Sequence, residues 1–151
     1  MGADWRCLVL WLFVIDLGIA CGAGLYEGRV VIPAWKEIPP RQWPNTGLLF
    51  WIYVTTIPLT LLAVINGIAA WSSEGARRPY WLCAAAVIAL ERVGTFAYFI
   101  PAMVGLAGSD LPPPEVEPAL SRWLLLNHGR HVLTLSGWLL AIRTLSLSHR
   151  E

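Results

Sequence analysis

The sequence predicts an all-α protein, an integral membrane four-helix bundle forming a single transmembrane domain over residues 1–151. Hydrophobic residues make up 56% of the chain, and charged residues make up only 14%. Soluble domains carry about 25% charged residues, so this chain has too few to cover a surface that faces water. It also contains four apolar stretches whose lengths suit the about 20 residues that a membrane-spanning helix needs.

The four apolar stretches cover residues 7–26, 47–71, 80–106 and 121–147. The first has the position of a signal peptide, but Asp16 interrupts its apolar run and no clear cleavage site follows. We therefore interpret it as a spanning helix. Gly18 and Gly22 lie four residues apart in this helix, which favours close packing of another helix against them.

Two proline-rich stretches separate these spans on the side opposite the termini, and we expect both to be external loops. They cover residues 27–46 and 107–120. Proline lacks the amide hydrogen that a helix needs and clashes with the preceding turn. We therefore expect Pro33 to lie beyond the end of the first helix, and Pro58 and Pro101 to kink the second and third.

Four spans place both termini on one side of the membrane. Five cationic residues fall on that side: Arg6, Arg77, Arg78, Arg143 and Arg150. Four fall on the opposite side: Arg29, Lys36, Arg41 and Arg122. Cytoplasmic loops carry an excess of such residues, and here the bias is weak. The acidic loop over residues 107–120 favours cytoplasmic termini, and we expect a location in the bacterial plasma membrane.

Ionisable residues interrupt the predicted spans, where they are costly and usually mark a site. With a rise of about 1.5 Å per residue, one group falls near the membrane midplane: Asp16, Glu91, Arg92 and His131. A second group falls nearer the outer face: Glu27, Tyr98, Asn127 and His128. Neighbouring helical residues point about 100° apart, so we expect Glu91 and Arg92 to pair with other helices rather than with each other.

A metal site is an alternative use of four of these residues. Glu27, Glu91, His128 and His131 are ligand types that suit iron, zinc or copper, and His131 could bind haem. Arg130 beside His131 opposes a bound cation, and the sequence has no Glu-x-x-His pair of the kind found in diiron bundles. We predict no cofactor and keep iron, copper or haem as the alternative.

Three short motifs follow one another along the chain in a familiar order. Leu25-Tyr26-Glu27 leads to Val31-Ile32-Pro33-Ala34-Trp35, Arg92 precedes Thr95-Phe96-Ala97-Tyr98-Phe99-Ile100-Pro101, and WLLLNHGR over residues 123–130 opens a leucine-rich helix that ends AIRTLSL. Their order and spacing over nearly the whole chain resemble a family of small four-span membrane proteins. That family includes the fungal anthrone oxygenases and many uncharacterised bacterial members.

The resemblance implies a cofactor-independent monooxygenase of polyketide biosynthesis that converts a lipophilic, anthrone-like polycyclic phenol to a quinone. A base removes a proton from the acidic central methylene, the anion reacts with dioxygen, and the resulting peroxide loses water. Such a site needs a base, a cation for the enolate oxygen and a dry aromatic pocket.

Roles for this chain's residues follow from the resemblance. His131 is the candidate base, Arg92 or Arg130 holds the anion, and Glu27 or Glu91 orients the imidazole. The remaining candidate substrate contacts are Trp35, Tyr98, Trp123, Asn127 and His128.

A non-enzymatic membrane subunit or small-molecule binder, whose buried ions only align the helices, is the alternative function. The expected partners are a lipophilic small molecule, dioxygen and the bilayer, with a homo-oligomer left open. A net charge of +1 gives no reason to expect nucleic-acid binding. The three cysteines lie far apart with no CxxC spacing, so we expect neither a disulfide framework nor a redox dithiol.

Overall fold

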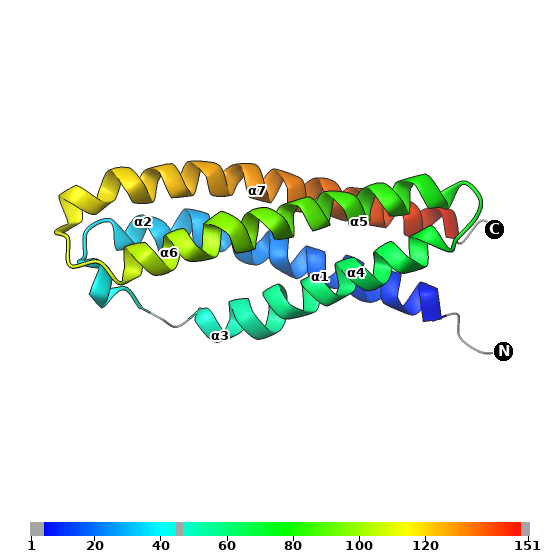
Figure 1. Cartoon of the computed structure of the whole chain (residues 1–151), viewed down its shortest axis with the longest axis horizontal. Coiled ribbons are helices and arrows are strands. Elements are labelled where there is room, and N and C mark those ends of the chain that lie inside the picture. The colour runs from blue at the N-terminus through cyan, green and yellow to red at the C-terminus, as the bar shows by residue number, and fades with distance from the viewer. Residues whose placement is uncertain (1–4, 45–46, 149–151) are drawn as a thin grey trace.

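The computed structural model describes residues 5–44 and 47–148, which form four long helical rods lying side by side (Figure 1). The prediction of an all-α fold is confirmed for the described residues. In each of the first three rods a π-helical segment, labelled η, joins two α-helices. The first rod is α1 (Trp5–Tyr26), η1 (Glu27–Val31) and α2 (Ile32–Trp35), and the second is α3 (Leu48–Phe50), η3 (Trp51–Thr56) and α4 (Ile57–Trp71). The third rod is α5 (Arg77–Gly94), η4 (Thr95–Phe99) and α6 (Ile100–Ala107), and the fourth is the single helix α7 (Pro113–Ser148). A short 3₁₀ helix, η2 (Pro40–Gln42), lies between the first two rods.

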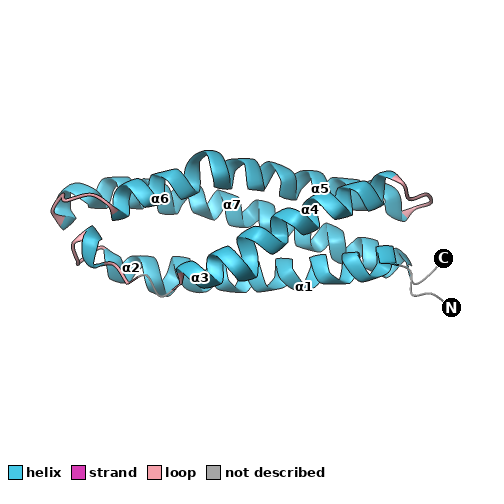
Figure 2. Cartoon of the chain, turned by 60° about the horizontal axis from the view of Figure 1, so that its bottom comes forward, coloured by secondary structure: helices cyan, strands magenta, loops and turns pink. Residues whose placement is uncertain are grey.

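The start of α1 and the end of α7 lie at the same end of the bundle, which we call the terminal end, and the opposite end is the loop end (Figure 1). Non-helical segments are confined to these two ends (Figure 2). The first three rods are each long and apolar enough to cross a membrane, over Trp5–Trp35, Leu48–Trp71 and Arg77–Ala107. The fourth rod, with 36 residues, is long enough but more polar.

Both external loops are shorter than the sequence analysis predicted. The first rod continues as a helix to Trp35, so residues 27–35 are not part of the external loop predicted over 27–46. Residues 45 and 46 lie outside the described part of the chain. The helix α7 begins at Pro113 instead of residue 121, which shortens the second loop to residues 108–112.

The physical reason for the first error is a widened helical turn before each proline. Pro33, Pro58 and Pro101 are each the second residue of an α-helix that follows directly on a π-helical segment. In an α-helix the proline ring would meet the carbonyl four residues earlier, and that carbonyl would lose its donor. A π turn bonds five residues back instead, so the rods pass through these prolines without ending.

The core of the terminal half is tightly packed. The buried residues there include Leu10, Phe13, Leu17, Leu59, Trp81, Ile88 and Ala141. Asn66 joins three rods in this half: its amide nitrogen donates to the carbonyl oxygens of Val9 at 3.2 Å and Leu62 at 2.8 Å, and its oxygen accepts from the Trp81 indole at 3.0 Å. Every bond of this buried amide is therefore made inside the protein.

Small residues let the rods approach one another. A Cβ added at Gly18 would lie 3.1 Å from the Trp138 ring, so the close packing predicted at Gly18 is present. Gly22 has no neighbour within 4 Å of such a Cβ, and the prediction was wrong there. Gly24 takes its place in the contact with α7, where its missing side chain makes room for His131.

The loop end is closed by a second apolar cluster. Ile32, Leu120 and Trp123 are buried there, and Trp35 stacks on Trp43 with ring centres 5.1 Å apart. Two ion pairs hold the surrounding loops: Lys36 with Glu117 at 3.8 Å and Arg41 with Asp110, whose Nη2–Oδ2 distance is 2.7 Å. We call this assembly the loop-end cap.

Candidate functional site

A small cavity lies between all four rods, at the depth where the sequence analysis placed the ionisable residues. The space open to the centres of water-sized molecules is about 20 Å³. One water needs about 10–15 Å³ on this measure, so the cavity has room for a molecule the size of water or dioxygen. Its walls are formed by Ala20, Trp51, Thr55, Thr56, Glu91, Arg92, Arg130, His131 and Thr134.

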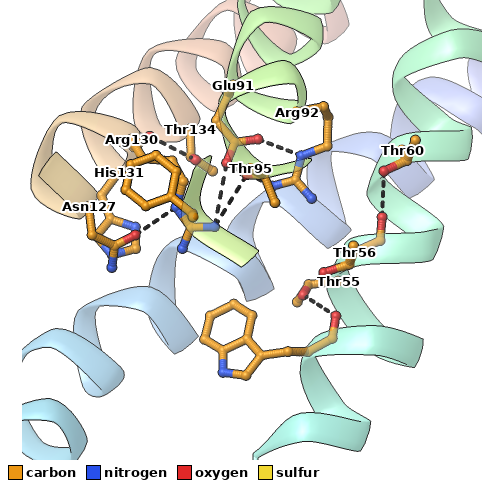
Figure 3. A network of polar contacts seen from close by, with 12 residues as sticks. Thr55, Thr56, Thr60, Glu91, Arg92, Thr95, Asn127, Arg130, His131 and Thr134 are labelled. Carbon is orange, nitrogen blue, oxygen red and sulfur yellow. Dashed lines mark hydrogen bonds and ion pairs between the residues drawn. The ribbon is translucent and has the colours of Figure 1, made fainter. Parts of the chain in front are cut away.

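The carboxylate of Glu91, almost fully buried, is the centre of the polar network (Figure 3). Arg92 donates to it through Nε at 2.5 Å and Nη2 at 2.7 Å, and the Thr95 hydroxyl donates at 3.0 Å. Arg130 Nη1 lies 3.8 Å from the same carboxylate. Two guanidinium groups from different rods therefore share one carboxylate.

The expectation that Glu91 and Arg92 pair only with other helices was wrong. Their Cβ atoms diverge, but the arginine side chain is long enough to fold back on its neighbour. A buried charge without a partner is costly, and the two-bond contact with Arg92 neutralises Glu91 at the shortest range. Arg130 of α7 then adds the contact between rods that the sequence analysis expected.

A hydrogen-bonded chain runs along α7 from Arg130 to His131. Arg130 Nε donates to Asn127 Oδ1 at 2.7 Å, and Asn127 Nδ2 lies 3.1 Å from His131 Nε2. A guanidinium can only donate, so the Asn127 oxygen must face Arg130 and its amide group must donate to the imidazole. His131 Nε2 is then an acceptor, and the ring is the neutral tautomer with its proton on Nδ1.

The His131 ring is placed by a glycine of the first rod. A Cβ built on Gly24 would lie 2.7 Å from His131 Nδ1 and 3.1 Å from Nε2, so the imidazole would have to move to make room for it. Gly24 is buried and helical. The absence of a side chain at this position therefore allows the Cε1 edge of the imidazole to approach the backbone of α1.

Two further carboxylates flank the cavity. Glu27 interacts with the Trp51 side chain and with Arg130. Asp16 is buried and interacts with Arg92, while its Oδ2 has no hydrogen-bond partner in the described part of the chain. The region thus contains three carboxyl groups and two guanidinium groups, but only one carboxylate, Glu91, belongs to the cavity wall.

The π-helical segments lie at the level of this polar network. Glu27 begins η1, Trp51 and Thr55 belong to η3, and Thr95 begins η4. Such widened turns are rare and are frequently found at functional sites. Here each one turns a polar or aromatic side chain toward the centre of the bundle.

Four predicted site residues are not brought to the cavity. Trp35 and Trp123 belong to the loop-end cap, where the Trp123 indole donates to the Phe99 carbonyl at 3.1 Å. Tyr98 is 37% exposed and contacts the edge of Phe99. His128 is exposed, and its Nδ1 is 2.6 Å from the Leu124 carbonyl oxygen.

Four residues of the cavity wall were not predicted as site residues: Ala20, Trp51, Thr55 and Thr56. The available signal was the Thr-Thr pair two residues before Pro58 in an otherwise apolar span. The Thr55 hydroxyl donates to the Trp51 carbonyl at 2.9 Å, which helps to satisfy the widened turn.

The four candidate metal ligands do not converge. His128 is exposed, His131 Nε2 is bonded to Asn127, and Glu91 is occupied by Arg92. Across residues 5–44 and 47–148, no group of three His, Cys, Asp or Glu side chains is arranged to hold a metal ion.

Comparison of the chain with protein-family models, with curated proteins and with solved structures gives no match in any of the three.

Proposed function

We propose that this protein is an integral membrane four-helix bundle and an oxidoreductase that adds oxygen to a lipophilic, anthrone-like phenol at Glu91, Arg92 and Arg130. The observation that carries the proposal is the pair of guanidinium groups on one buried carboxylate. Counting only the groups that line the cavity, two guanidinium groups face one carboxylate, which suits one oxyanion; Glu27 and Asp16 interact with Arg130 and Arg92 from outside the wall. The resemblance described above supplies the reaction class.

The surface of α7 supports its placement in the bilayer despite its polar residues. Leu125, Val132 and Leu139 recur every seven residues and are 73%, 62% and 57% exposed. Asn127 and Thr134 face the other rods and are buried. A helix surrounded by lipid is expected to turn its polar groups toward the other helices and an apolar stripe toward the lipid.

Glu91 is a better candidate than His131 for the base. His131 Nε2 already accepts a hydrogen bond from Asn127, so it has no lone pair there for a substrate proton. Proton transfer to Glu91 moves the negative charge onto the substrate oxygen while both arginines stay beside it. No net charge is created in the low-dielectric interior, where new charge would be expensive.

His131 and Asn127 then act as positioning residues for Arg130. The bond from Arg130 Nε to Asn127 fixes the guanidinium plane, and the contact with His131 fixes the amide. The ring of Phe99, with its centre 5.2 Å from Arg130 Cζ, covers the guanidinium on the side of the loop end.

The reaction balances without another reductant. The substrate methylene carbon loses two hydrogen atoms, one oxygen atom of dioxygen becomes the new carbonyl oxygen, and the other leaves as water. Glu91 accepts the first proton, and Arg92 and Arg130 hold the enolate. The cavity has room for the oxygen atoms, while ligand pockets for ring systems start at about 300 Å³, so the rings require a wider opening.

The test is oxygen consumption and quinone formation by purified protein with a panel of anthrones, in the presence of a chelator. We expect turnover in the wild type, loss in Glu91→Gln, and a reduced rate in Arg130→Lys. Arg143→Lys, at the exposed terminal end, is the matched control and should retain the wild-type rate. Turnover in Glu91→Gln equal to the wild type would remove Glu91 from the mechanism, and no turnover of any anthrone by the wild type would reject the proposed reaction.

A second candidate function is binding of a phenolate or similar anion without chemistry. The small size of the cavity and the satisfied hydrogen bonds of its walls favour it. Stabilisation of the wild type, but not of Arg130→Gln, by a phenolic ligand without oxygen consumption would support this function over the first.

A further inference from the structure

Both ends of the bundle are closed above and below the cavity. Toward the terminal end, Leu17, Ile88 and Trp81 are almost completely buried and fill the space between the rods. Toward the loop end, Trp123 and Ile32 of the cap are buried. A ligand that reaches Arg92 and Arg130 from water would have to cross one of these packed layers.

The side of the bundle is loosely packed along the loop-end half of the second rod, in contrast to the two closed ends. No residue of α3 is buried, and Leu49 and Tyr53 are each 67% exposed. The α4 half packs along α1 and α5, whereas α3 packs mainly on η3 of its own rod. In Figure 1 the α3 ribbon diverges from α2 and α6.

This loosely packed half adjoins the cavity directly. Trp51, Thr55 and Thr56 of η3 form one wall, opposite Glu91 and Arg92 (Figure 3). The Thr55 hydroxyl bonds to a carbonyl of its own helix, as does the hydroxyl of Thr60 at 2.6 Å. These hydroxyls thus bond within the second rod and do not tie it to the arginines.

The second rod also contains a place to bend between its two halves. The six-residue π segment η3 is followed by Pro58 in the first turn of α4. Prolines and π turns are the usual causes of helix bending. Movement there would carry Trp51 away from the cavity and break its side-chain contact with Glu27 of the first rod, while α4 stays packed against α1 and α5.

We infer that the gap between η3 and the α5–η4 rod is a lateral entrance, through which a flat lipophilic molecule with one ionisable oxygen passes from the bilayer core to Arg92 and Arg130. The occupant follows from the surroundings: an apolar, lipid-facing approach leads to a cavity wall in which two guanidinium groups face one carboxylate. This inference rests on the proposed function for the chemical class of the ligand. The route itself can be tested without turnover.

The test is labelling of a thiol in the cavity wall of the reconstituted full chain. Thr134→Cys is introduced after Cys7, Cys21 and Cys83 are replaced by alanine. In the same background, Leu135→Cys, at a position 45% exposed beside it, reports exposure to lipid, and Glu117→Cys reports exposure to water at the loop end.

Two thiol reagents then separate a route through lipid from a route through water. A pyrene maleimide that partitions into the bilayer should label the Thr134→Cys and Leu135→Cys variants. A charged methanethiosulfonate applied from either side should label only the Glu117→Cys variant.

A second substitution tests the bending point. Pro58→Ala restores the backbone donor and allows an ordinary α-helix, so we expect labelling of the Thr134→Cys variant to fall about tenfold, which corresponds to about 1.4 kcal/mol in the population of the open state. Pro33→Ala and Pro101→Ala are matched controls and should leave the rate unchanged. Labelling of Leu135→Cys in the same background controls for delivery of the reagent from the bilayer.

Three results would overturn the inference. The first is labelling of the Thr134→Cys variant by the charged reagent as fast as that of Glu117→Cys, and the second is no labelling of the Thr134→Cys variant by the lipophilic reagent. The third is a disulfide between two copies of Leu49→Cys that blocks labelling, which would show that a second copy of the chain covers α3. Loss of anthrone turnover with intact lateral labelling would reject the proposed reaction and leave the entrance standing.

Discussion

Arg92 folds back onto Glu91, its neighbour in the sequence, and makes two hydrogen bonds to the carboxylate at 2.5 and 2.7 Å. The pair is buried, with Glu91 1% and Arg92 8% exposed. Because Arg130 approaches the same carboxylate, Glu91 compensates two cations. Its removal should therefore do more damage than the removal of either arginine.

We predict that Glu91→Gln lowers the free energy of unfolding by about 3–5 kcal/mol, since it removes the carboxylate that two buried guanidinium groups share. The double variant Glu91→Gln/Arg92→Gln should recover at least about 1 kcal/mol of that loss, because one uncompensated charge is removed. Unfolding in mixed micelles measures both. Additive losses in the double variant would show that the two side chains are not coupled.

Gly24→Ala should displace the His131 ring and destabilise the protein by about 1–3 kcal/mol, the usual cost of overpacking. Gly22→Ala is the matched control in the same helix. It should change stability by less than about 0.5 kcal/mol, because open space surrounds the added methyl group. In the His131→Ala background the cost of Gly24→Ala should disappear, and a cost that persists there would contradict the contact.

The hydrogen-bonded chain on α7 predicts the tautomer of His131. Arg130 fixes the Asn127 oxygen and Asn127 donates to Nε2, so the imidazole should be neutral and protonated on Nδ1. Nitrogen-15 NMR of labelled histidine in the purified protein distinguishes this tautomer from the other two protonation forms. A proton on Nε2 would require the Asn127 amide to be reversed and would break its bond to Arg130.

Much of the fold could be predicted because the low charged content and the long apolar runs of the sequence indicate apolar helices of membrane-spanning length. The third span, expected over residues 80–106, closely matches Arg77–Ala107, since its apolar run has clear limits. The first span was cut short because the effect of Pro33 depends on the turn before it. A π turn leaves no local signature in the sequence that separates it from a helix end.

The candidate site was predicted best where only depth mattered. Glu91, Arg92, Arg130 and His131 line one cavity because depth along a helix follows from residue number at about 1.5 Å per residue. Tyr98 was misplaced because it lies seven residues after Glu91, within a π segment that turns less per residue than an α-helix. The direction in which a side chain points around a helix therefore cannot be predicted where the helical period changes, whereas its depth along the helix still can.

The two ends of the bundle differ in how their cations are paired. Arg78 lies over the Trp71 ring and Arg143 over the Tyr80 ring at the terminal end, with distances of 5.9 and 5.7 Å to the ring centres. At the loop end, Lys36 and Arg41 instead face the carboxylates of Glu117 and Asp110. Arg150, counted in the sequence analysis, lies outside the described residues.

A guanidinium group that lies over an aromatic ring still has free N–H groups that can donate to lipid phosphates. The cytoplasmic leaflet is the one that contains anionic lipids. We therefore predict that the terminal end is cytoplasmic. In intact cells, a membrane-impermeant thiol reagent should label Asp110→Cys, whereas Glu74→Cys should be labelled only after the membrane is opened. The double variant Arg78→Gln/Arg143→Gln should insert in mixed orientations, while Lys36→Gln/Arg41→Gln should keep one. Labelling of Glu74→Cys in intact cells that carry the otherwise unchanged chain would reverse the assignment.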